Sequence, residues 1–276
     1  MYDSRWFDKS LVLRDGVRLT SRIWLPNGNG PWPALLMRQP YGREIASTIT
    51  YSHPTWWTSK GYMVIIQDVR GMGSSEGVFN GFKQEASDTS ETHEWVRSLK
   101  ECNGKLGLYG FSYQGFTQLT GESNSKPPDC LSPAMTGMNI KDHWCSDGGA
   151  YWWHNNIAWG LQIAALKMKR ENNLSEWGKI RLALENKSYL SEGIDILKKY
   201  DPNSFVLLWL NNLSNACSFE EFKPISSWIK QPMLIIGGLW DPHLKGAFDL
   251  YKKSKEAGGS PEIIIGNATH LNWWEG

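Results

Sequence analysis

Short apolar runs that alternate with helical segments are the feature that most constrains the fold of this chain. Pro33–Met37, Met63–Gln67 and Lys105–Tyr109 have the length and composition of strands that are covered on both faces. Helical segments precede the second and third runs, at Ser52–Lys60 and around Trp95–Leu99. This alternation predicts a mostly parallel sheet with right-handed crossovers, and therefore an α/β fold.

The two ends of the chain extend this sheet. Ser10–Arg14 and Val17–Leu25 flank Asp15-Gly16, a pair that favours a tight hairpin turn. Near the other end, Met233–Gly237 and Glu262–Ile265 are predicted strands. The helix between them is expected to turn one apolar face inward, formed by Leu244, Ala247, Phe248 and Tyr251.

The middle of the chain has helical periodicity and no strand signal. Apolar residues there repeat at the spacing of one helix face: Ile157, Leu161, Ala164, Ala165 and Met168. We therefore expect a core formed by residues 1–138 and 229–276, interrupted by a helical cap insertion over residues 139–228. A chain of 276 residues is too short for two full-sized domains with independent cores.

Charge and composition exclude several classes of partner. The 29 basic and 28 acidic residues give a net charge of +1, which argues against nucleic acid or an anionic membrane. No apolar run reaches the roughly 18 residues of a membrane helix, and the N-terminus lacks the apolar region of a signal peptide. Four cysteines without a CxxC pair predict reduced, mostly buried thiols in a cytoplasmic protein: Cys102, Cys130, Cys145 and Cys217. The sequence indicates no cofactor and no oligomeric state.

A candidate nucleophile lies between a predicted strand and the segment after it. Gly110 to Gly115 read G-x-S-x-x-G, so the second glycine falls one place later than in the common G-x-S-x-G elbow. Such a turn would expose the hydroxyl of Ser112 at a helix N-terminus and make the N–H of Tyr113 an oxyanion donor. The alternative is that Ser112 only caps a helix.

A serine nucleophile needs a base and a carboxylate that orients the base. His270 follows the last predicted strand, where this fold type presents its base, and Asp241 follows the strand before it. Asp241 precedes Pro242 and could also cap a helix. Asp68 is a rival acid, but it precedes the serine and breaks the expected chain order.

Tryptophan is unusually frequent, with 16 residues that include three adjacent pairs: Trp56-Trp57, Trp152-Trp153 and Trp273-Trp274. Paired tryptophans in loop-like contexts suit an apolar pocket wall, although core packing would also accommodate them. The predicted substrate-pocket residues are Trp152, Trp153 and Trp240.

Several longer segments together carry a family resemblance. They are RQPYGR at 38–43, QDVRGMGSSEG at 67–77, EWVRSLKECNGKLGLYGFSYQG at 94–115 and GGLWDP at 237–242, with the late His270. The chain resembles the family of cocaine esterase, X-Pro dipeptidyl-peptidases and α-amino-acid ester hydrolases. The resemblance implies the α/β-hydrolase fold, a triad of Ser112, Asp241 and His270, and an oxyanion hole in which the phenol of Tyr41 joins the Tyr113 N–H. It implies a structural role for the Asp68–Gly71 segment, which would tie loops near the site.

The chain departs from this family in two places. The α-amino-acid ester hydrolases carry acidic residues just after the catalytic aspartate, where this chain has Pro242, His243 and Leu244. An acid elsewhere, such as Asp142 or Asp147, would have to bind a substrate ammonium. Family members also continue into a C-terminal β-sandwich, whereas this sequence stops six residues after His270. We expect either a fragment or a natural minimal form.

These features predict a serine hydrolase that cleaves small carboxylic esters or amides through an acyl-enzyme. X-Pro dipeptidyl-peptidase or aminoacyl ester hydrolase activity is an alternative, as is an inactive remnant that binds apolar ligands. Metal-dependent hydrolysis would need a site in the insertion, and the spacing of the available ligands matches no standard zinc pattern: Asp142, His143, Cys145 and His154.

Overall fold

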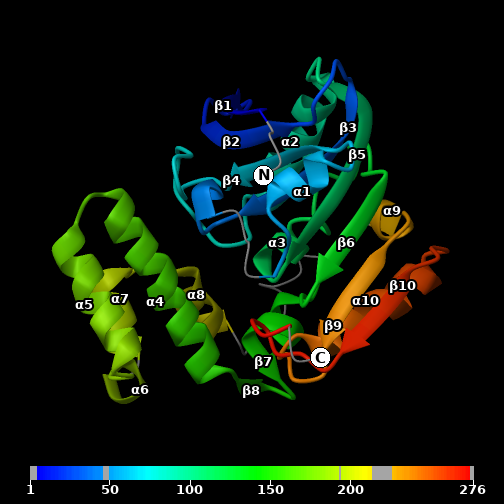
Figure 1. Cartoon of the computed structure of the whole chain (residues 1–276). Coiled ribbons are helices and arrows are strands. Elements are labelled where there is room, and N and C mark those ends of the chain that lie inside the picture. Colours follow the sequence, from blue (N-terminus) through cyan, green and yellow to red (C-terminus); the bar gives the residue numbers. More distant parts are fainter. Residues whose placement is uncertain (1–4, 46–49, 193, 213–225, 274–276) are drawn as a thin grey trace.

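A large mixed sheet forms the centre of the structure, a computed structural model that describes residues 5–45, 50–192, 194–212 and 226–273 (Figure 1). Within these residues the sheet has eight strands, in the order β1-β2-β4-β3-β5-β6-β9-β10. They are β1 (Arg5–Val12), β2 (Arg18–Leu25), β3 (Trp32–Gln39), β4 (Met63–Asp68), β5 (Cys102–Phe111), β6 (Cys130–Ala134), β9 (Leu234–Gly238) and β10 (Glu262–Gly266).

The sheet is parallel except at one edge. The hairpin β1–β2 is antiparallel and pairs antiparallel with β4, and every further neighbour, from β4 to β10, runs parallel. The predicted hairpin is present and Gly16 has φ +88°, but its turn includes residue 14 as well as Asp15-Gly16, because the Leu13 N–H donates to the Val17 carbonyl at 2.8 Å. Because β3, β5, β6, β9 and β10 are parallel, the residues after these strands all lie at the same edge.

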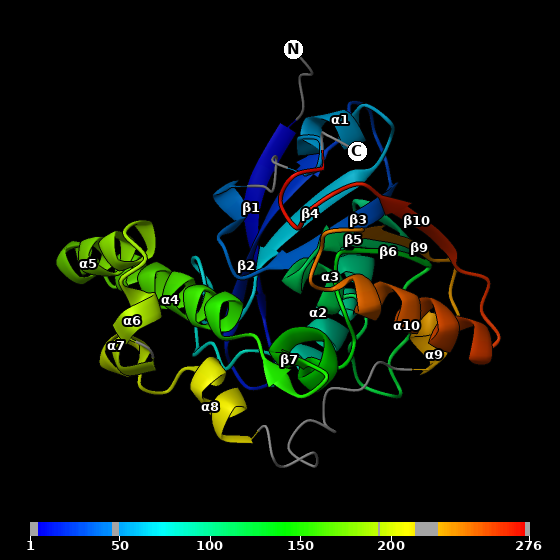
Figure 2. The same cartoon turned by 90° about the horizontal axis from the view of Figure 1, so that it is seen from below.

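Helices cover both faces of the sheet (Figure 2). On one face, α2 (Glu85–Ser98), α9 (Ser226–Ile229) and α10 (Leu244–Glu256) pack against alternate strand residues such as Leu36 and Ile65. On the other, α1 (Pro54–Thr58) adds Trp57 to a cluster built on the remaining strand residues, among them Met37 and Ile66. Burial on both faces explains why these strands read as continuous apolar runs.

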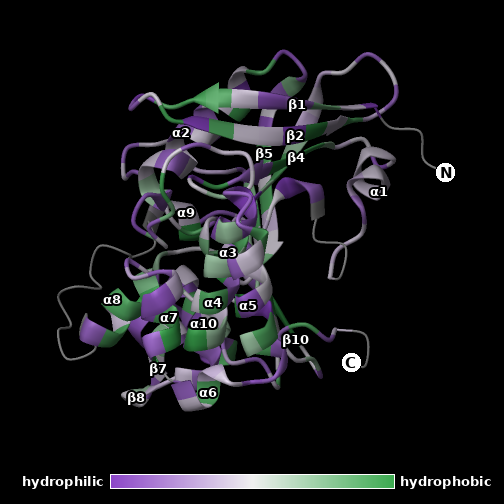
Figure 3. Cartoon of the chain, turned by 90° about the vertical axis from the view of Figure 1, so that its left-hand side faces the viewer, coloured by the Kyte–Doolittle hydropathy of each residue, from purple (hydrophilic) through white to green (hydrophobic). Residues whose placement is uncertain are grey.

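The middle of the chain lies beside the sheet (Figures 1 and 2). Its helices are α4 (Trp153–Arg170), α5 (Leu174–Glu185), α6 (Tyr189–Glu192), α7 (Ile194–Tyr200) and α8 (Phe205–Asn212). The predicted face of α4 is buried, with Ile157, Leu161 and Ala164 inaccessible to solvent. These helices alternate hydrophilic and hydrophobic residues (Figure 3) and share an aromatic cluster with α3 (Tyr113–Phe116), which follows Ser112.

Three details of the predicted fold are wrong. Strand β6 was not expected, because serine and Pro133 weaken its strand signal. The middle region is not free of strands: after a π-type turn at Lys141–Cys145, β7 (Ser146–Asp147) and β8 (Ala150–Tyr151) form a small hairpin. In α10 the inward face is rotated from the expected one.

The buried residues of α10 include Ala247 and Leu250, while Phe248 is 50% exposed. The glycine at 246 makes this rotation possible, because a Cβ there would lie 2.6 Å from the backbone of Gly137. Small residues therefore let α10 approach the chain after β6 closely, and the larger Phe248 lies outside the contact.

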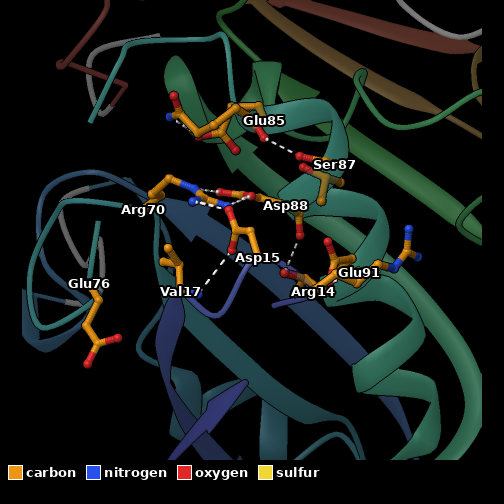
Figure 4. Close-up of polar contacts among 12 residues, drawn as sticks. Arg14, Asp15, Val17, Arg70, Glu76, Glu85, Ser87, Asp88 and Glu91 are labelled. Carbon is orange, nitrogen blue, oxygen red and sulfur yellow. Dashed lines mark hydrogen bonds and ion pairs between the residues drawn. The ribbon is translucent and has the colours of Figure 1, made fainter. Parts of the chain in front are cut away.

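The segment after β4 ties loops together by ion pairs, as the sequence predicts. Arg70 forms a two-point contact with Asp88 of α2, at 2.9 and 2.6 Å, and a third bond at 2.6 Å to Asp15 of the first hairpin (Figure 4). Asp88 is fully buried, and Arg70 satisfies both of its oxygens.

The cysteines follow the prediction only in part. Cys102 and Cys145 are buried free thiols, whereas Cys130 is exposed, and Cys217 lies outside the described residues. Among the helices of the described ranges, none is long and apolar enough to cross a membrane.

His93 of α2 is a buried base with a consequence for stability. It is 1% exposed and stacks on Trp228 with ring centroids 5.0 Å apart, and neither ring nitrogen has a hydrogen-bond partner among the described residues. Burial lowers the pKa of His93 well below its usual value, and Arg97 and Arg38 lower it further. The folded protein therefore holds His93 neutral.

Acid should destabilise the protein through this group. In the unfolded chain histidine titrates near pH 6.5, so the unfolded state binds more protons as the pH falls below that value. Between about pH 7.5 and pH 5 the free energy of unfolding should drop by up to about 2 kcal/mol more in the wild type than in His93→Phe. Urea unfolding of both proteins at the two pH values measures this difference. Parallel pH dependences would contradict it.

Candidate active site

Ser112 occupies a strained turn between β5 and α3. Its backbone has φ +57° and ψ −127°, a region that is rare for residues with a side chain. The Ser112 N–H donates to the carbonyl of Ala134 on β6 at 2.9 Å. The helix that follows, α3, has four residues, and the Ser112 side chain makes no capping hydrogen bond to it. The structure therefore does not support the alternative that Ser112 only caps a helix.

Two glycines make this turn possible, and their contacts explain the late second glycine. Gly110 has φ +139°, and a Cβ on it would lie 2.5 Å from the Cβ of Gln114. A Cβ on Gly115 would lie 2.7 Å from the side chain of Thr136, which follows β6. The close approach between α3 and the chain after β6 thus occurs at position 115, so position 114 is free to carry a glutamine.

His270 and Asp241 form a hydrogen-bonded pair. The Nδ1 of His270 lies 2.5 Å from Oδ2 of Asp241, although 29 residues separate them in the sequence. Asp241 is buried, while the His270 side chain is 27% exposed. Because a carboxylate only accepts, Nδ1 carries the proton and Nε2 of a neutral His270 is left as an acceptor.

The second oxygen of Asp241 has its own partner at the helix entrance, although Asp241 is not the cap residue that the sequence allowed for. Oδ1 accepts the N–H of His243 at 2.7 Å, at the entrance to α10. His243 rather than Asp241 holds the cap position of that helix. Both carboxylate oxygens are thus used, which restricts the orientation of the side chain facing His270.

The rival acid, Asp68, lies in a different set of contacts. It accepts from the backbone and side chain of Arg43 and, at 3.0 Å, from the N–H of Ser74. It is fully buried, and burial raises its pKa while Arg43 and the Ser74 N–H oppose the rise. Its bonds tie the turn that carries Tyr41 to the glycine-rich loop after β4.

Tyr41 lies in that turn, near the candidate nucleophile. The side chain of Ser112 is close enough to the Tyr41 phenol to lower its pKa. Burial raises the pKa of Tyr41 to about 12, and the Ser112 hydroxyl and the Trp159 indole only partly offset this. The phenol therefore keeps its proton at neutral pH and has a hydrogen to donate.

The side chain of Tyr113, the first residue of α3, is anchored by two hydrogen bonds. Its hydroxyl lies 2.6 Å from the carbonyl oxygen of Gly81 and 2.8 Å from the carboxylate of Glu85. The side chains of Tyr113 and Glu85 are both fully buried. Glu85 pairs with Arg38 of β3 at 2.5 Å. The backbone N–H of Tyr113, at the start of α3, has no acceptor within the helix, as is general for the first turn.

The loop that carries His270 is anchored on both sides. Before His270, the backbone N–H of Trp240 donates to the carbonyl of Ala268 at 3.0 Å. After it, the indole N–H of Trp273 donates to the His270 carbonyl at 3.2 Å. The Trp273 ring packs against Phe111 with centroids 5.7 Å apart, and Phe111 lies 5.6 Å from the His270 ring. Sequence reasoning missed this anchor because Trp273 appeared only as one of a pair; Trp274 lies outside the described residues.

His243 is a second histidine beside the pair. Its ring centroid lies 5.2 Å from that of His270, and its Nδ1 lies 2.6 Å from the carbonyl oxygen of His143. A carbonyl can only accept, so Nδ1 is the donor. Burial and the neighbouring His270 lower the pKa of His243 to about 4, so it is neutral at pH 7. From the sequence, His243 was recognised only as one of the residues that stand where α-amino-acid ester hydrolases carry acidic residues.

The three predicted pocket tryptophans occupy different surroundings. Trp152 is half-buried, with its ring 5.9 Å from that of His243. Trp153 packs on Tyr151 and is 38% exposed. Trp240 is 71% exposed and donates to Asn267 at 2.7 Å. Through this contact with His243, Trp152 lies beside a neighbour of the His270–Asp241 pair.

The residues considered for a metal site have separate partners. His143 bonds Asp249 at 2.9 Å, and His154 lies 2.7 Å from the hydroxyl of Tyr189. Cys145 is fully buried, and burial raises the pKa of its thiol. Within the described ranges, no three histidine, cysteine or acidic side chains are placed to hold a metal ion.

The sequence of this chain is similar to that of a known esterase. Cocaine esterase from Rhodococcus sp. (strain MB1 Bresler) is 32% identical over 158 residues, which are 55% of this chain and 27% of that protein. The matched region thus covers about a quarter of the length of this relative.

Two solved structures share the fold over nearly the whole chain. A CocE/NonD family hydrolase from Staphylococcus aureus matches with a TM-score of 0.73 at 20% identity, covering 99% of this chain and 47% of its own. An aminopeptidase from a marine sediment archaeon, Thaumarchaeota archaeon, matches with a TM-score of 0.68 at 20% identity, covering 98% and 49%. The predicted α/β-hydrolase fold is confirmed.

The sequence family described as X-Pro dipeptidyl-peptidase (S15 family) matches residues 15–272, a range that includes the hairpin turn, the elbow and the loop of His270. The chain belongs to this family, as its resemblance predicted.

Proposed function

We propose that this protein is a serine hydrolase that cleaves small carboxylic esters, and amides more slowly, through an acyl-enzyme on Ser112. The observation that carries the proposal is the bond between His270 and Asp241, because it leaves Nε2 of His270 as a proton acceptor. The membership in a family of serine peptidases and the similarity to cocaine esterase support the same chemistry.

In this mechanism His270 acts as general base and then as general acid. Nε2 takes the proton of Ser112 as its oxygen attacks the carbonyl carbon, and later gives that proton to the leaving alcohol or amine. Water then attacks the acyl-enzyme, again with His270 as base. Asp241 orients the ring and stabilises the imidazolium that forms in each step.

The oxyanion would be held by the phenol of Tyr41 and the backbone N–H of Tyr113. Support for the first donor is its place close to Ser112 and its raised pKa, which keeps it protonated. Support for the second is its place at the start of α3, beside the strained serine. Both would bind the oxygen more tightly as its negative charge develops.

We further propose that residues 139–228 form a cap over a core of residues 1–138 and 229–276. The support is the helical content of the middle region and the packing of Trp159, on α4, and of Tyr41 against the same buried cluster. In this arrangement Trp152, Trp153 and Trp240 are the proposed contributors to an apolar substrate pocket, with Trp152 beside His243.

Removal of the triad should abolish ester hydrolysis. Ser112→Ala and His270→Ala should each lower kcat for a p-nitrophenyl ester by roughly 10⁴–10⁶-fold, and to a similar degree, because the residues act as a unit. Ser112→Ala should also lose covalent labelling by a fluorophosphonate. A folded wild type that is neither active nor labelled would leave only the ligand-binding alternative. Aminoacyl esters and X-Pro anilides in the same screen test the other two substrate classes.

Tyr41→Phe should lower kcat by about 10²–10³-fold, the usual cost of one oxyanion donor. The aromatic ring and its packing are retained, so KM and the urea midpoint should change little. Steady-state kinetics and urea unfolding measure both quantities. A kcat close to the wild-type value would remove the phenol from the oxyanion hole.

Trp273→Phe tests the anchor of the base. The variant keeps an aromatic ring against Phe111 but loses the N–H that donates to the His270 carbonyl. We expect kcat to fall by about 3- to 10-fold, since a lost neutral hydrogen bond is worth about 0.5–1.5 kcal/mol. Trp6→Phe is the matched control, since Trp6 is 56% exposed on β1, at the edge of the sheet opposite β10, and this change should leave kcat close to the wild-type value.

A further inference from the structure

Two buried glutamines that the proposed chemistry does not use are bonded to each other. Gln39 ends β3 and Gln114 belongs to α3, and each side chain is 1% exposed. The Nε2 of Gln114 donates to Oε1 of Gln39 at 3.1 Å. Buried amides need partners, but most side chains bond to backbone, so an amide–amide contact is uncommon.

The outer ends of this pair reach the two halves of the site. Nε2 of Gln39 donates to the carbonyl of Gly42, the residue after Tyr41, at 3.1 Å. Oε1 of Gln114 accepts the N–H of Phe111, the residue before Ser112, at 3.2 Å. A continuous line of hydrogen bonds therefore connects the turn of the phenol with the strained backbone of the serine.

The orientation of both amides follows from their backbone partners. Phe111 presents an N–H, so Gln114 must turn its oxygen toward it and its NH₂ group toward Gln39. Gln39 then presents its oxygen to Gln114 and its NH₂ group to the carbonyl of Gly42. Reversing either amide would place two donors or two acceptors together in a buried site. The line of bonds therefore has one satisfied arrangement.

We propose that Gln39 and Gln114 are positioning residues that hold the phenol of Tyr41 in register with Ser112. The inference rests on the proposed function. An oxyanion donor acts over a narrow range of about 2.7–3.1 Å, so a small shift of the Tyr41 turn removes its contribution. Gly42 has φ +97°, and Asp68 holds the far side of the turn through Arg43. The Gln39–Gln114 pair connects the other side of this turn to the backbone beside Ser112.

A double-mutant cycle between Gln114→Met and Tyr41→Phe tests this role. Methionine retains the volume of glutamine without its hydrogen bonds. Gln114→Met should lower kcat for a p-nitrophenyl ester by about tenfold with KM within about twofold, a coupling typical of residues in one network. In the Tyr41→Phe background the same change should cost almost nothing, because the phenol it positions is already gone. Gln39→Met should behave in the same way.

Gln118→Met is the matched control. Gln118 is also a buried amide near the elbow, but its hydrogen bonds among the described residues go to the backbone of Gly110, Gln114 and Ser132 and not to the Tyr41 turn. Its effect on kcat should be additive with that of Tyr41→Phe. Urea unfolding of each variant shows whether it is folded.

Hydrogen exchange supplies a readout that does not need activity. Amides of residues 41–44 should exchange faster in Gln114→Met and Gln39→Met than in the wild type, and not in Gln118→Met. Additive losses of kcat between Gln114→Met and Tyr41→Phe, or unchanged exchange in residues 41–44, would overturn the proposal. A wild type that hydrolyses no ester would instead count against the proposed function, and the exchange measurement would still decide whether the pair holds the turn.

Discussion

The backbone of Ser112 imposes the constraint on which the rest of the site depends. A residue with a side chain at φ +57° and ψ −127° is held there only when its surroundings leave no alternative. The N–H of Ser112 is bonded to β6, Gly110 leaves space for Gln114, and Gly115 lets α3 approach the chain after β6. Strands β5 and β6 and the short helix must therefore all be in place before the serine can be.

The parallel part of the sheet distributes the remaining groups around this serine. Tyr41 follows β3, Asp68 ends β4, Asp241 follows β9 and His270 follows β10. A further close approach joins the last two strands, since a Cβ on Gly238 would lie 2.4 Å from the carbonyl oxygen of Ala268. This contact brings the loop of Asp241 against the loop of His270 and accounts for a bond between residues so far apart in sequence.

The sequence allowed most of the fold and the pairing of His270 with Asp241 to be predicted, because both follow from strand order. Apolar runs buried on both faces identify β3, β4 and β5 without knowledge of the tertiary structure. Strand β6 was not predicted because its own sequence has a weak strand pattern. Its burial comes from pairing with its neighbours β5 and β9. The rotation of α10 escaped because it depends on the chain after β6, which periodicity within the helix does not reveal.

Residues that position the site were the hardest to find, for a different physical reason. Gln39, Gln114 and Trp273 have no pattern of spacing that marks them, since their roles depend on single hydrogen bonds across the tertiary structure. Asp68 shows the same problem from the other side. Its place at a strand end is one where a catalytic acid can lie. Both of its carboxylate oxygens, however, accept hydrogen bonds from Arg43 or from the Ser74 N–H.

The distribution of charge around the pair suggests how these roles are separated. The groups beside Ser112 and His270 are neutral at pH 7: the phenol of Tyr41 keeps its proton and His243 lacks one. Two buried arginines form ion pairs with groups other than Ser112, Asp241 and His270: Arg38 pairs with Glu85, and Arg43 pairs with Asp68. In the proposed mechanism, these neutral neighbours would leave the Asp241 carboxylate to stabilise the imidazolium of His270 and would add no negative charge of their own near the oxyanion. Charged pairs then set the position of loops, and hydrogen bonds between neutral groups set the position of the reacting atoms.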